Sequence, residues 1–351
     1  MVASERYARS ATRWGVAVRR LWLASLVSLL VGCAAVSSLS PGANPLPPSA
    51  LLATIPVGEA PTMLAMAPDG SRVYAASNGR LSIISTQTNS IVATIPIDPN
   101  PSGIAITPDG RRVLVTNLFS VRLTVLDTQS NTLADPIDLF SERFRGGFGR
   151  IGLSPDGRVA FVTNQANAVL AIVNTIQGSV ESRMMDIRPT DVAITPDGRS
   201  AFVCGCKPVC TTGTIEVIDP ATRDSRASID VGPAPYRIAF SPDGTRVYTT
   251  NLDSATVSVV NVSGQTTTAT VPVSPEPTGL AVTRDGAMIY VASLPTGNVT
   301  AIDAATNTVR STVKVSDAAR EVVVTPDGRC LYVSSAHSVV VVDRRAFTPG
   351  P

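Results

Sequence analysis

Four charged residues share one position of a repeated segment and could together hold a ligand. Each lies seven residues before the glycine of a recurring Ser/Thr-Pro-Asp-Gly segment, and they are Arg150, Asp191, Arg237 and Glu321. The remaining copies of the segment place Met63, Gly103 and Gly279 at this position. Guanidinium and carboxylate groups that converge on one place can grip a small polar or charged ligand. The alternative is that the four side chains pair with one another across the mouth of a channel.

The only histidine of the chain, His337, is a candidate for the same site. Imidazole titrates near neutral pH and serves as a general acid or base. One histidine does not build a triad hydrolase or a histidine-based metalloenzyme when no glycine-flanked nucleophile motif and no clustered carboxylates accompany it. We therefore predict no catalytic residue, no bound metal and no cofactor. A lactonase-like or lyase-like enzyme that uses Arg, Glu and His337 is the alternative.

Three cysteines lie close together in the sequence: Cys204, Cys206 and Cys210. Their spacing suggests metal ligands, but no second pair and no histidine lies nearby in sequence to complete a zinc site. In an exported protein a disulfide is the better interpretation. We predict a Cys206–Cys210 disulfide, with Cys204–Cys210 as the main rival, and a buried unpaired thiol at Cys330.

The repeated segment itself predicts the fold. Its glycine recurs seven times, at intervals of 40 to 47 residues, as Gly70, Gly110, Gly157, Gly198, Gly244, Gly286 and Gly328. Ser/Thr-Pro-Asp-Gly is typical of a tight turn, because proline presets φ and aspartate bonds the local backbone. Four short apolar strands in about 40–45 residues are typical of one propeller blade. We predict an all-β, seven-bladed β-propeller of four-stranded blades over residues 51–346, followed by a tail at 347–351.

The two ends of the repeat predict how the ring closes. The segment Leu51–Val57 resembles the last strand of a blade, whereas the seventh repeat lacks its fourth strand. We predict that this N-terminal strand completes the last blade and covers an open sheet edge. Burial of Leu51, Ile55 and Val57 should then stabilise the ring by several kcal/mol, at roughly 1.5–3 per side chain.

One rim of the propeller collects the departures from the repeat. The crossover Phe140–Arg150, the enlarged loop that carries Cys206 and Cys210, and His337 are all expected on the rim of the four charges. Repeat proteins bind ligands through the residues that vary, so we predict that this rim binds a ligand and that the Pro-Asp-Gly rim is inert. Phenylalanines 140, 144 and 148 of the crossover predict either an exposed edge for a partner or a plug packed on the rim.

The N-terminal segment predicts export and anchorage. The apolar stretch Leu21–Gly32 has the length of a signal peptide and is too short to span a bilayer. It ends in Leu-Val-Gly-Cys33, which resembles the lipobox of bacterial lipoproteins, and that resemblance implies a lipidated Cys33 as first mature residue. We predict a signal peptide at 1–32, a Ser/Pro-rich tether at 33–50 and a membrane anchor in the cell envelope, in the periplasm or on the cell surface. The alternative is an ordinary signal peptide with a chance cysteine.

Charge argues against nucleic-acid binding. Without residues 1–32 the chain has 24 basic and 26 acidic residues. A mildly acidic domain lacks the basic footprint of a nucleic-acid binder. We expect a monomer whose partners are the membrane and either a small polar ligand or an envelope protein.

A motif recurs on the second strand of three repeats, as Leu114-Val-Thr-Asn117, Phe161-Val-Thr-Asn164 and Tyr248-Thr-Thr-Asn251. Together with the Pro-Asp-Gly turns it resembles the YVTN family of β-propeller repeat proteins, over about residues 51–343. That resemblance implies a propeller in a surface-layer or periplasmic setting, with lactonases and redox enzymes among related propellers. The sequence therefore favours an exported, lipid-anchored module that binds a ligand or a protein, and an enzyme is the alternative.

Overall fold

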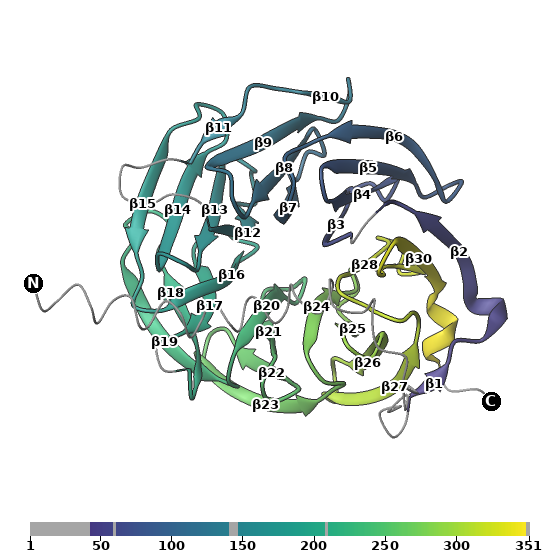
Figure 1. Cartoon of the computed structure of the whole chain (residues 1–351). Coiled ribbons are helices and arrows are strands. Elements are labelled where there is room, and N and C mark those ends of the chain that lie inside the picture. Colours follow the sequence, from purple (N-terminus) through teal and green to yellow (C-terminus); the bar gives the residue numbers. More distant parts are fainter. Residues whose placement is uncertain (1–42, 59–60, 140–146, 208–209, 349–351) are drawn as a thin grey trace, which may run out of the picture. The chain divides into compact units, whose positions relative to one another are not determined.

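A ring of seven antiparallel β-sheets forms the described part of the protein. The structure is a computed structural model that describes residues 43–58, 61–139, 147–207 and 210–348. The chain divides into two units, Met1–Leu39 and Ser40–Pro351. Because the first unit lies outside the described residues, so do the predicted signal peptide and Cys33. The described residues of the second unit form seven four-stranded blades around one axis (Figure 1), which confirms the predicted all-β propeller.

In blades one to six the strands follow one another outward from the axis in chain order. The strands of blades one to three are β3 (Met63–Met66), β4 (Arg72–Ser77), β5 (Arg80–Ser85), β6 (Ser90–Pro96), β7 (Pro101–Ile106), β8 (Arg112–Asn117), β9 (Arg122–Asp127), the short β10 (Thr132–Leu133) and β11 (Ile137–Asp138), β12 (Phe148–Leu153), β13 (Val159–Asn164), β14 (Val169–Asn174) and β15 (Val180–Met184). Those of blades four to six are β16 (Arg188–Ile194), β17 (Ala201–Cys206), β18 (Gly213–Ile218), β19 (Ser225–Val231), β20 (Pro235–Phe240), β21 (Arg246–Asn251), β22 (Thr256–Asn261), β23 (Thr266–Pro272), β24 (Pro277–Val282), β25 (Met288–Ser293), β26 (Asn298–Asp303) and β27 (Thr308–Lys314).

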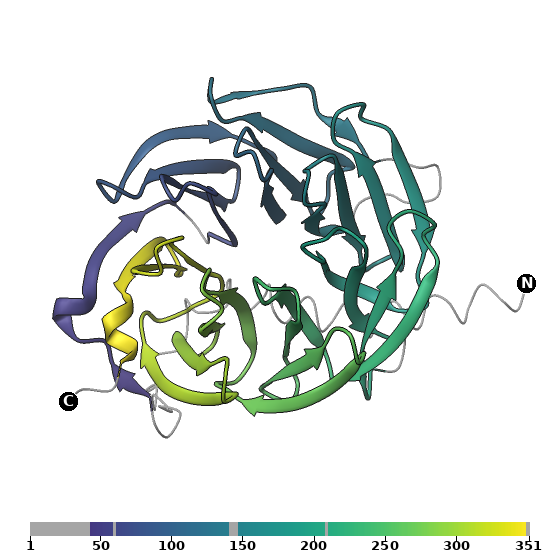
Figure 2. The same cartoon turned by 180° about the vertical axis from the view of Figure 1, so that it is seen from behind.

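Blade seven combines both ends of the described chain. It contains β28 (Val322–Val324), β29 (Cys330–Ser334), β30 (Ser338–Asp343) and, as its outermost strand, β2 (Leu51–Pro56). Strand β2 runs antiparallel to β30, with Ile55 opposite Val339, and both figures of the ring show it outside β30 (Figures 1 and 2). Ile55 and Val57 are buried, but Leu51 is 44% exposed. The predicted closure is therefore confirmed, whereas the predicted burial of Leu51 is wrong.

The residues before β2 lie against the neighbouring blade. The short strand β1 (Asn44–Pro45) pairs in parallel with β27, and the 3-10 helix η1 (Pro48–Ala50) follows it. Leu46 packs on a cluster of buried residues between blades six and seven, close to the second 3-10 helix, η2 (Arg344–Phe347). The end of the predicted tether is thus in contact with the propeller. Among the described residues no helix is both long enough and apolar enough to cross a membrane.

Hydrophobic burial holds the blades together. Seven clusters of buried residues occur, one at each interface between neighbouring blades. The second strand of every blade contributes one large side chain that is at most 2% exposed, from the set Tyr74, Leu114, Phe161, Phe202, Tyr248, Tyr290 and Tyr332. Because a blade buries both faces only between two neighbours, the ring stabilises itself through these seven interfaces.

The Pro-Asp-Gly turns form one rim. In the turn of blade three the Gly157 amide donates to the Ser154 carbonyl, 2.8 Å away, and Gly157 adopts a φ of +69°. Asp156 accepts hydrogen bonds from the Ser154 hydroxyl (2.6 Å) and the Arg158 amide (3.0 Å). A Cβ atom at Gly157 would lie 2.9 Å from Cδ of Pro108 in the preceding blade. Glycine is therefore required both by the positive φ and by the close approach of the turn of the preceding blade.

Candidate functional site at the propeller axis

The four charged residues lie on the innermost strands, at the rim opposite the Pro-Asp-Gly turns. Arg150, Asp191 and Arg237 belong to β12, β16 and β20, and Glu321 directly precedes β28. A β-bulge interrupts the strand pairing around Arg150 and directly before Asp191 and Arg237. Bulges bend a strand and redirect a side chain, and here they accompany side chains that reach toward the axis.

Hydroxyl groups of the second strands fix the backbone of three ring residues. The amide of Arg150 donates to the Thr163 hydroxyl at 2.9 Å, and the amide of Glu321 donates to the Ser334 hydroxyl at 2.9 Å. The Arg237 amide donates in the same way to a buried threonine of β21, at 3.1 Å. These hydrogen bonds fix the backbone from which three of the four charged side chains extend.

Two ring positions are closed to any side chain. A Cβ atom at Gly103 would lie 2.3 Å from the Gly149 carbonyl oxygen, and one at Gly279 would lie 2.9 Å from the Arg320 carbonyl oxygen. Contacts that short require the backbone to move. The polar side chains of this ring are therefore confined to blades three, four, five and seven.

The four charges pair with one another in one connected network. Arg150 Nη1 lies 2.9 Å from Glu321 Oε2, and Arg237 Nη2 lies 3.2 Å from Glu321 Oε1. Arg237 Nη1 lies 2.9 Å from Asp191 Oδ2. The Arg237 side chain is 20% exposed, and the other three are at most 7% exposed. The sequence left two interpretations open, a grip on a ligand and pairing of the four side chains with one another. In the structure the side chains pair with one another.

Arg150 is the most deeply embedded cation of the network. Its Nη1 also contacts Met63 Sδ at 2.7 Å, and its guanidinium carbon lies 5.6 Å from the centre of the Tyr236 ring, within cation–π range. Burial acts to lower the pKa of Arg150, but Glu321, Tyr236 and Asp191 outweigh burial and the pKa is raised. Arg150 is thus a permanent cation. Tyr236 was not predicted, although its blade is the only one with an aromatic residue directly before the ring position.

Every oxygen of the two carboxylates accepts at least one hydrogen bond. Asp191 Oδ1 accepts from the Val192 amide (2.9 Å), and its Oδ2 accepts from Arg237 and from the Ile238 amide (3.1 Å). Each oxygen of Glu321 accepts from one arginine. Burial raises the pKa of Asp191, against the opposing effect of Arg237, Arg150 and the two amides.

The atoms of the network that lack any hydrogen-bond partner in the described part of the chain are donors. Arg150 Nη2 and Arg237 Nε are buried and have no hydrogen-bond partner among the described residues. Buried polar groups are nearly always hydrogen-bonded, so two unmatched guanidinium N–H groups at one axis indicate a place for acceptor atoms. A group that completed the hydrogen bonding of these donors would have to supply acceptor atoms, and neither carboxylate of the network is free to act as a general base.

His337 does not join this network. It lies exposed in the loop between β29 and β30, on the same rim, and its ring makes no hydrogen bond or ion pair with the other described residues. In addition, the described part of the chain contains no group of three or more His, Cys, Asp or Glu side chains arranged to hold a metal ion.

The loops of this rim are only partly described. Phe148 is 1% exposed and packs between blades two and three. Of the two predictions for the crossover phenylalanines, packing on the propeller is therefore correct for Phe148, and an exposed partner-binding edge is not. Phe140 and Phe144 lie outside the described residues. Cys206 and Cys210 are joined by a disulfide in the loop between β17 and β18, and Cys204 is a buried free thiol. Cys330 is a free thiol, as predicted, but it is only partly buried.

Solved structures share this fold at low sequence identity. The chain is 17% identical to a chain of hydrazine synthase from Kuenenia stuttgartiensis, with a TM-score of 0.74 over 83% of this chain and 97% of that one. It is 11% identical to the β-propeller domain of Cps50 (Swd1) from Myceliophteria thermophila, with a TM-score of 0.71 over 84% and 98%. Identities this low establish the fold alone. No curated protein sequence matches the chain.

A family match covers more than half of the sequence. It spans residues 141–337, from the crossover into blade three to the loop of blade seven, and so includes all four charges of the axial network. This family is not the YVTN family that the motifs resemble, so membership of the latter stays a prediction. The chain belongs to the family described as the SMP-30/Gluconolactonase/LRE-like region.

Proposed function

We propose that the protein is an exported, lipid-anchored β-propeller of the cell envelope that binds a small ligand with acceptor oxygens, such as a carboxylate, at the axial network. The observation that carries this proposal is the unmatched donor pair, Arg150 Nη2 and Arg237 Nε. Every carboxylate oxygen of the network already accepts from a donor, whereas these two N–H groups have no acceptor among the described residues, so acceptor atoms of a ligand would complete their hydrogen bonding.

Ligand selectivity would follow from the surrounding side chains. Two guanidinium groups favour an anionic oxygen over a neutral one because charge-assisted hydrogen bonds are about twice as strong as neutral ones. Tyr236 already lies over Arg150 and would limit the size of the ligand on that side. Arg237 is the most exposed member of the network and is the natural first contact.

The cellular setting rests on sequence features. The apolar stretch before Cys33 and the lipobox-like residues support export and lipidation, and the recurring Val-Thr-Asn motifs support a YVTN-type envelope propeller. Replacing Cys33 with serine should release the mature protein from membranes or stop its processing. Mass spectrometry that finds an unmodified mature N-terminus at another residue would contradict the anchor and leave the axial site untouched.

A small-molecule binding assay tests the axial site. Formate, succinate and gluconate at millimolar concentrations serve as probes in thermal-shift and calorimetric titrations of the full mature chain. We expect at least one of them to bind, and Arg150→Gln to weaken that binding at least tenfold. The matched control is Arg158→Gln, an exposed arginine on the opposite rim. Binding that is equal in Arg150→Gln, or absent for all three carboxylates, would contradict the proposal.

An enzyme is the second candidate because the matched family carries gluconolactonase in its name. A lactone also presents carbonyl oxygen to donors, but its hydrolysis needs a base to activate water. Both carboxylates at the axis are engaged, so we expect no acceleration of glucono-lactone hydrolysis above the buffer rate. Turnover that is abolished by Glu321→Gln or Asp191→Asn would replace the binding module with a lactonase.

A further inference from the structure

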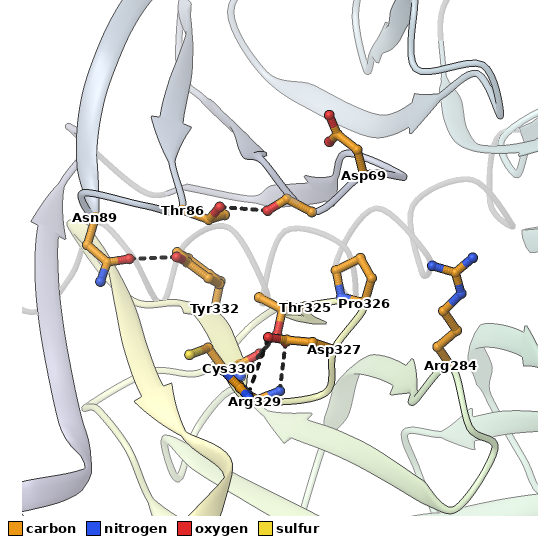
Figure 3. A pocket seen from close by; sticks show the side chains of 11 residues that line it. Asp69, Thr86, Asn89, Arg284, Thr325, Pro326, Asp327, Arg329, Cys330 and Tyr332 are labelled. Carbon is orange, nitrogen blue, oxygen red and sulfur yellow. Dashed lines mark hydrogen bonds and ion pairs between the residues drawn. The ribbon is translucent and has the colours of Figure 1, made fainter.

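A cavity lies on the Pro-Asp-Gly rim, which the sequence predicts to be inert. It occupies about 510 Å³ at the interface between blade seven and blade one, where the ring closes. Figure 3 shows Asn89 and Tyr332 at one end of it, Asp69 and Asp327 along it, and Arg284 at the other end.

At three other interfaces an arginine side chain bridges the same place. The residue two positions after the turn glycine is arginine in blades one, two and five, as Arg72, Arg112 and Arg246. Each of them donates across the interface to a backbone carbonyl of the next blade: Arg72 to Thr128, Arg112 to Thr175 and Arg246 to Ala304. Arg72 Nη1 lies 3.1 Å from its carbonyl acceptor and 3.2 Å from Asn131 Oδ1.

Blade seven has Cys330 at this position, and a thiol is too short to reach across. The acceptors on the facing blade are nevertheless retained. Thr86 is the counterpart of Thr128, since each amide donates to the residue after its turn glycine, Ser71 in one case and Arg111 in the other. Asn89 follows Thr86 by three residues, as Asn131 follows Thr128, and both asparagines adopt positive φ.

We propose that this cavity binds the guanidinium group of a ligand, in the place that the Arg72 guanidinium takes at the next interface. The acceptors are the Thr86 carbonyl and Asn89 Oδ1. Asn89 Oδ1 already accepts from the Tyr332 hydroxyl at 2.6 Å, and an amide oxygen has a second lone pair for another donor. A guanidinium group satisfies two acceptors at once through its planar fork of N–H groups.

The charges around the cavity are compatible with a cation at its Asn89 end. Hydrogen bonds from the Ser71 amide and hydroxyl lower the pKa of Asp69, so this carboxylate is ionised at neutral pH. Arg329 lies 3.7 Å from its own partner, Asp327. Arg284 is the remaining cation, and Figure 3 shows it at the opposite end from Asn89. The thiol of Cys330 is neutral, because burial raises its pKa.

The guanidinium group could come from a free alkylguanidine or from an arginine side chain of a peptide. Both sources are tested with the full mature chain, using agmatine as one probe and acetyl-Gly-Arg-Gly-amide as the other. A peptide with citrulline in place of arginine is the matched neutral probe. We expect the guanidinium probes to bind and the citrulline peptide to bind at least tenfold more weakly. Stronger binding of the peptide than of agmatine assigns the site to a polypeptide partner, and the reverse assigns it to a small molecule.

Variants of the repeat position decide whether the cavity is responsible. Cys330→Arg should fill the slot from within, abolish binding of both guanidinium probes and raise the melting temperature. Cys330→Met fills the slot without a charge and should also block binding, so it serves as the test if Cys330→Arg fails to fold. Blade six already has a methionine, Met288, at this position. Arg72→Cys should create a second slot between blades one and two and double the binding stoichiometry.

Three outcomes would overturn the proposal. They are no binding of either guanidinium probe to the wild type at millimolar concentration, equal binding to wild type and both Cys330 variants, and equal binding of the citrulline peptide. None of these results depends on the axial site, because Arg150→Gln leaves the cavity intact.

Discussion

Arg150 and Glu321 join opposite sides of the propeller, with 2.9 Å between Nη1 and Oε2, although they are 171 residues apart in sequence. Arg150 comes from blade three and Glu321 from blade seven, on β12 and just before β28 (Figure 1). Glu321 also binds Arg237 of blade five. One carboxylate therefore links three blades across the axis, and a ligand that binds the arginines there would act on the ring as a whole.

Removing this carboxylate should destabilise the ring. Glu321→Gln leaves two largely buried arginines with a single carboxylate, and breaking a buried ion pair by removing one partner costs about 3–5 kcal/mol. Chemical denaturation of the variant should show a loss of that size. Asp253→Asn is the matched control, because Asp253 is exposed and makes no hydrogen bond or ion pair with other described residues. Equal stability of the two variants would show that the network contributes little to folding.

The contribution of β2 to closing the ring should come from its buried side chains and not from its exposed ones. Ile55→Ala removes a side chain that is 4% exposed and belongs to the core between blades seven and one, at a cost of about 2–5 kcal/mol. Leu52→Ala on the same strand removes a side chain that is 44% exposed and should change stability by less than about 0.5 kcal/mol. Denaturant midpoints of the two variants measure the difference, and similar losses would argue that β2 does not seal the ring.

Much of the fold could be predicted because it repeats. Seven Asp-Gly turns, six of them Pro-Asp-Gly, indicated the number of blades, and the missing last strand of blade seven indicated the role of Leu51–Val57. The same counting placed Arg150, Asp191, Arg237 and Glu321 on one rim. Even the unfilled slot could have been predicted, since an alignment of the repeats shows Arg72 where blade seven has Cys330.

Pairing across the axis could not be predicted in the same way. Which arginine reaches which carboxylate depends on bulges, on side-chain length and on the distance between opposite strands, and a repeat does not encode these. The contact of Arg150 with Tyr236 has the same origin. The matched family could not be predicted from the recurring motifs either, because those motifs belong to turns and buried strands, which many propellers share.

The loop disulfide should be detectable by peptide mapping. The structure joins Cys206 to Cys210, while Cys204 is buried and burial raises its pKa to about 12. Alkylation of the native protein should therefore label Cys330 before Cys204, and a non-reduced digest should contain the Cys206–Cys210 link. A Cys204–Cys210 link would support the rival pairing. Free thiols at all three positions would reject both, and stoichiometric zinc would favour metal ligation.

The Pro-Asp-Gly aspartates should make the protein sensitive to acid. Hydrogen bonds from the Thr107, Ser154 and Thr195 hydroxyls, and then from backbone amides, hold the pKa values of Asp109, Asp156 and Asp197 below their usual range. A carboxylate with a lowered folded-state pKa contributes stability above its unfolded pKa, about 3.9, and loses that contribution as the pH falls through the folded value. The denaturation midpoint should thus be constant near neutral pH and fall below about pH 4.

A single substitution isolates one of these turns. Asp156→Ala removes the acceptor of two hydrogen bonds and should cost about 1 kcal/mol at pH 7. Its effect should shrink as the pH falls below about 4 and through the lowered folded-state pKa of Asp156, because the carboxylate that accepts these bonds becomes protonated. Asp243→Ala should change stability in the same direction, since Asp243 accepts from Ser241 and Thr245 in its own turn. Binding of carboxylates at the axial site should be unchanged in both variants. A loss of that binding would indicate that the ligand binds at the Pro-Asp-Gly rim instead.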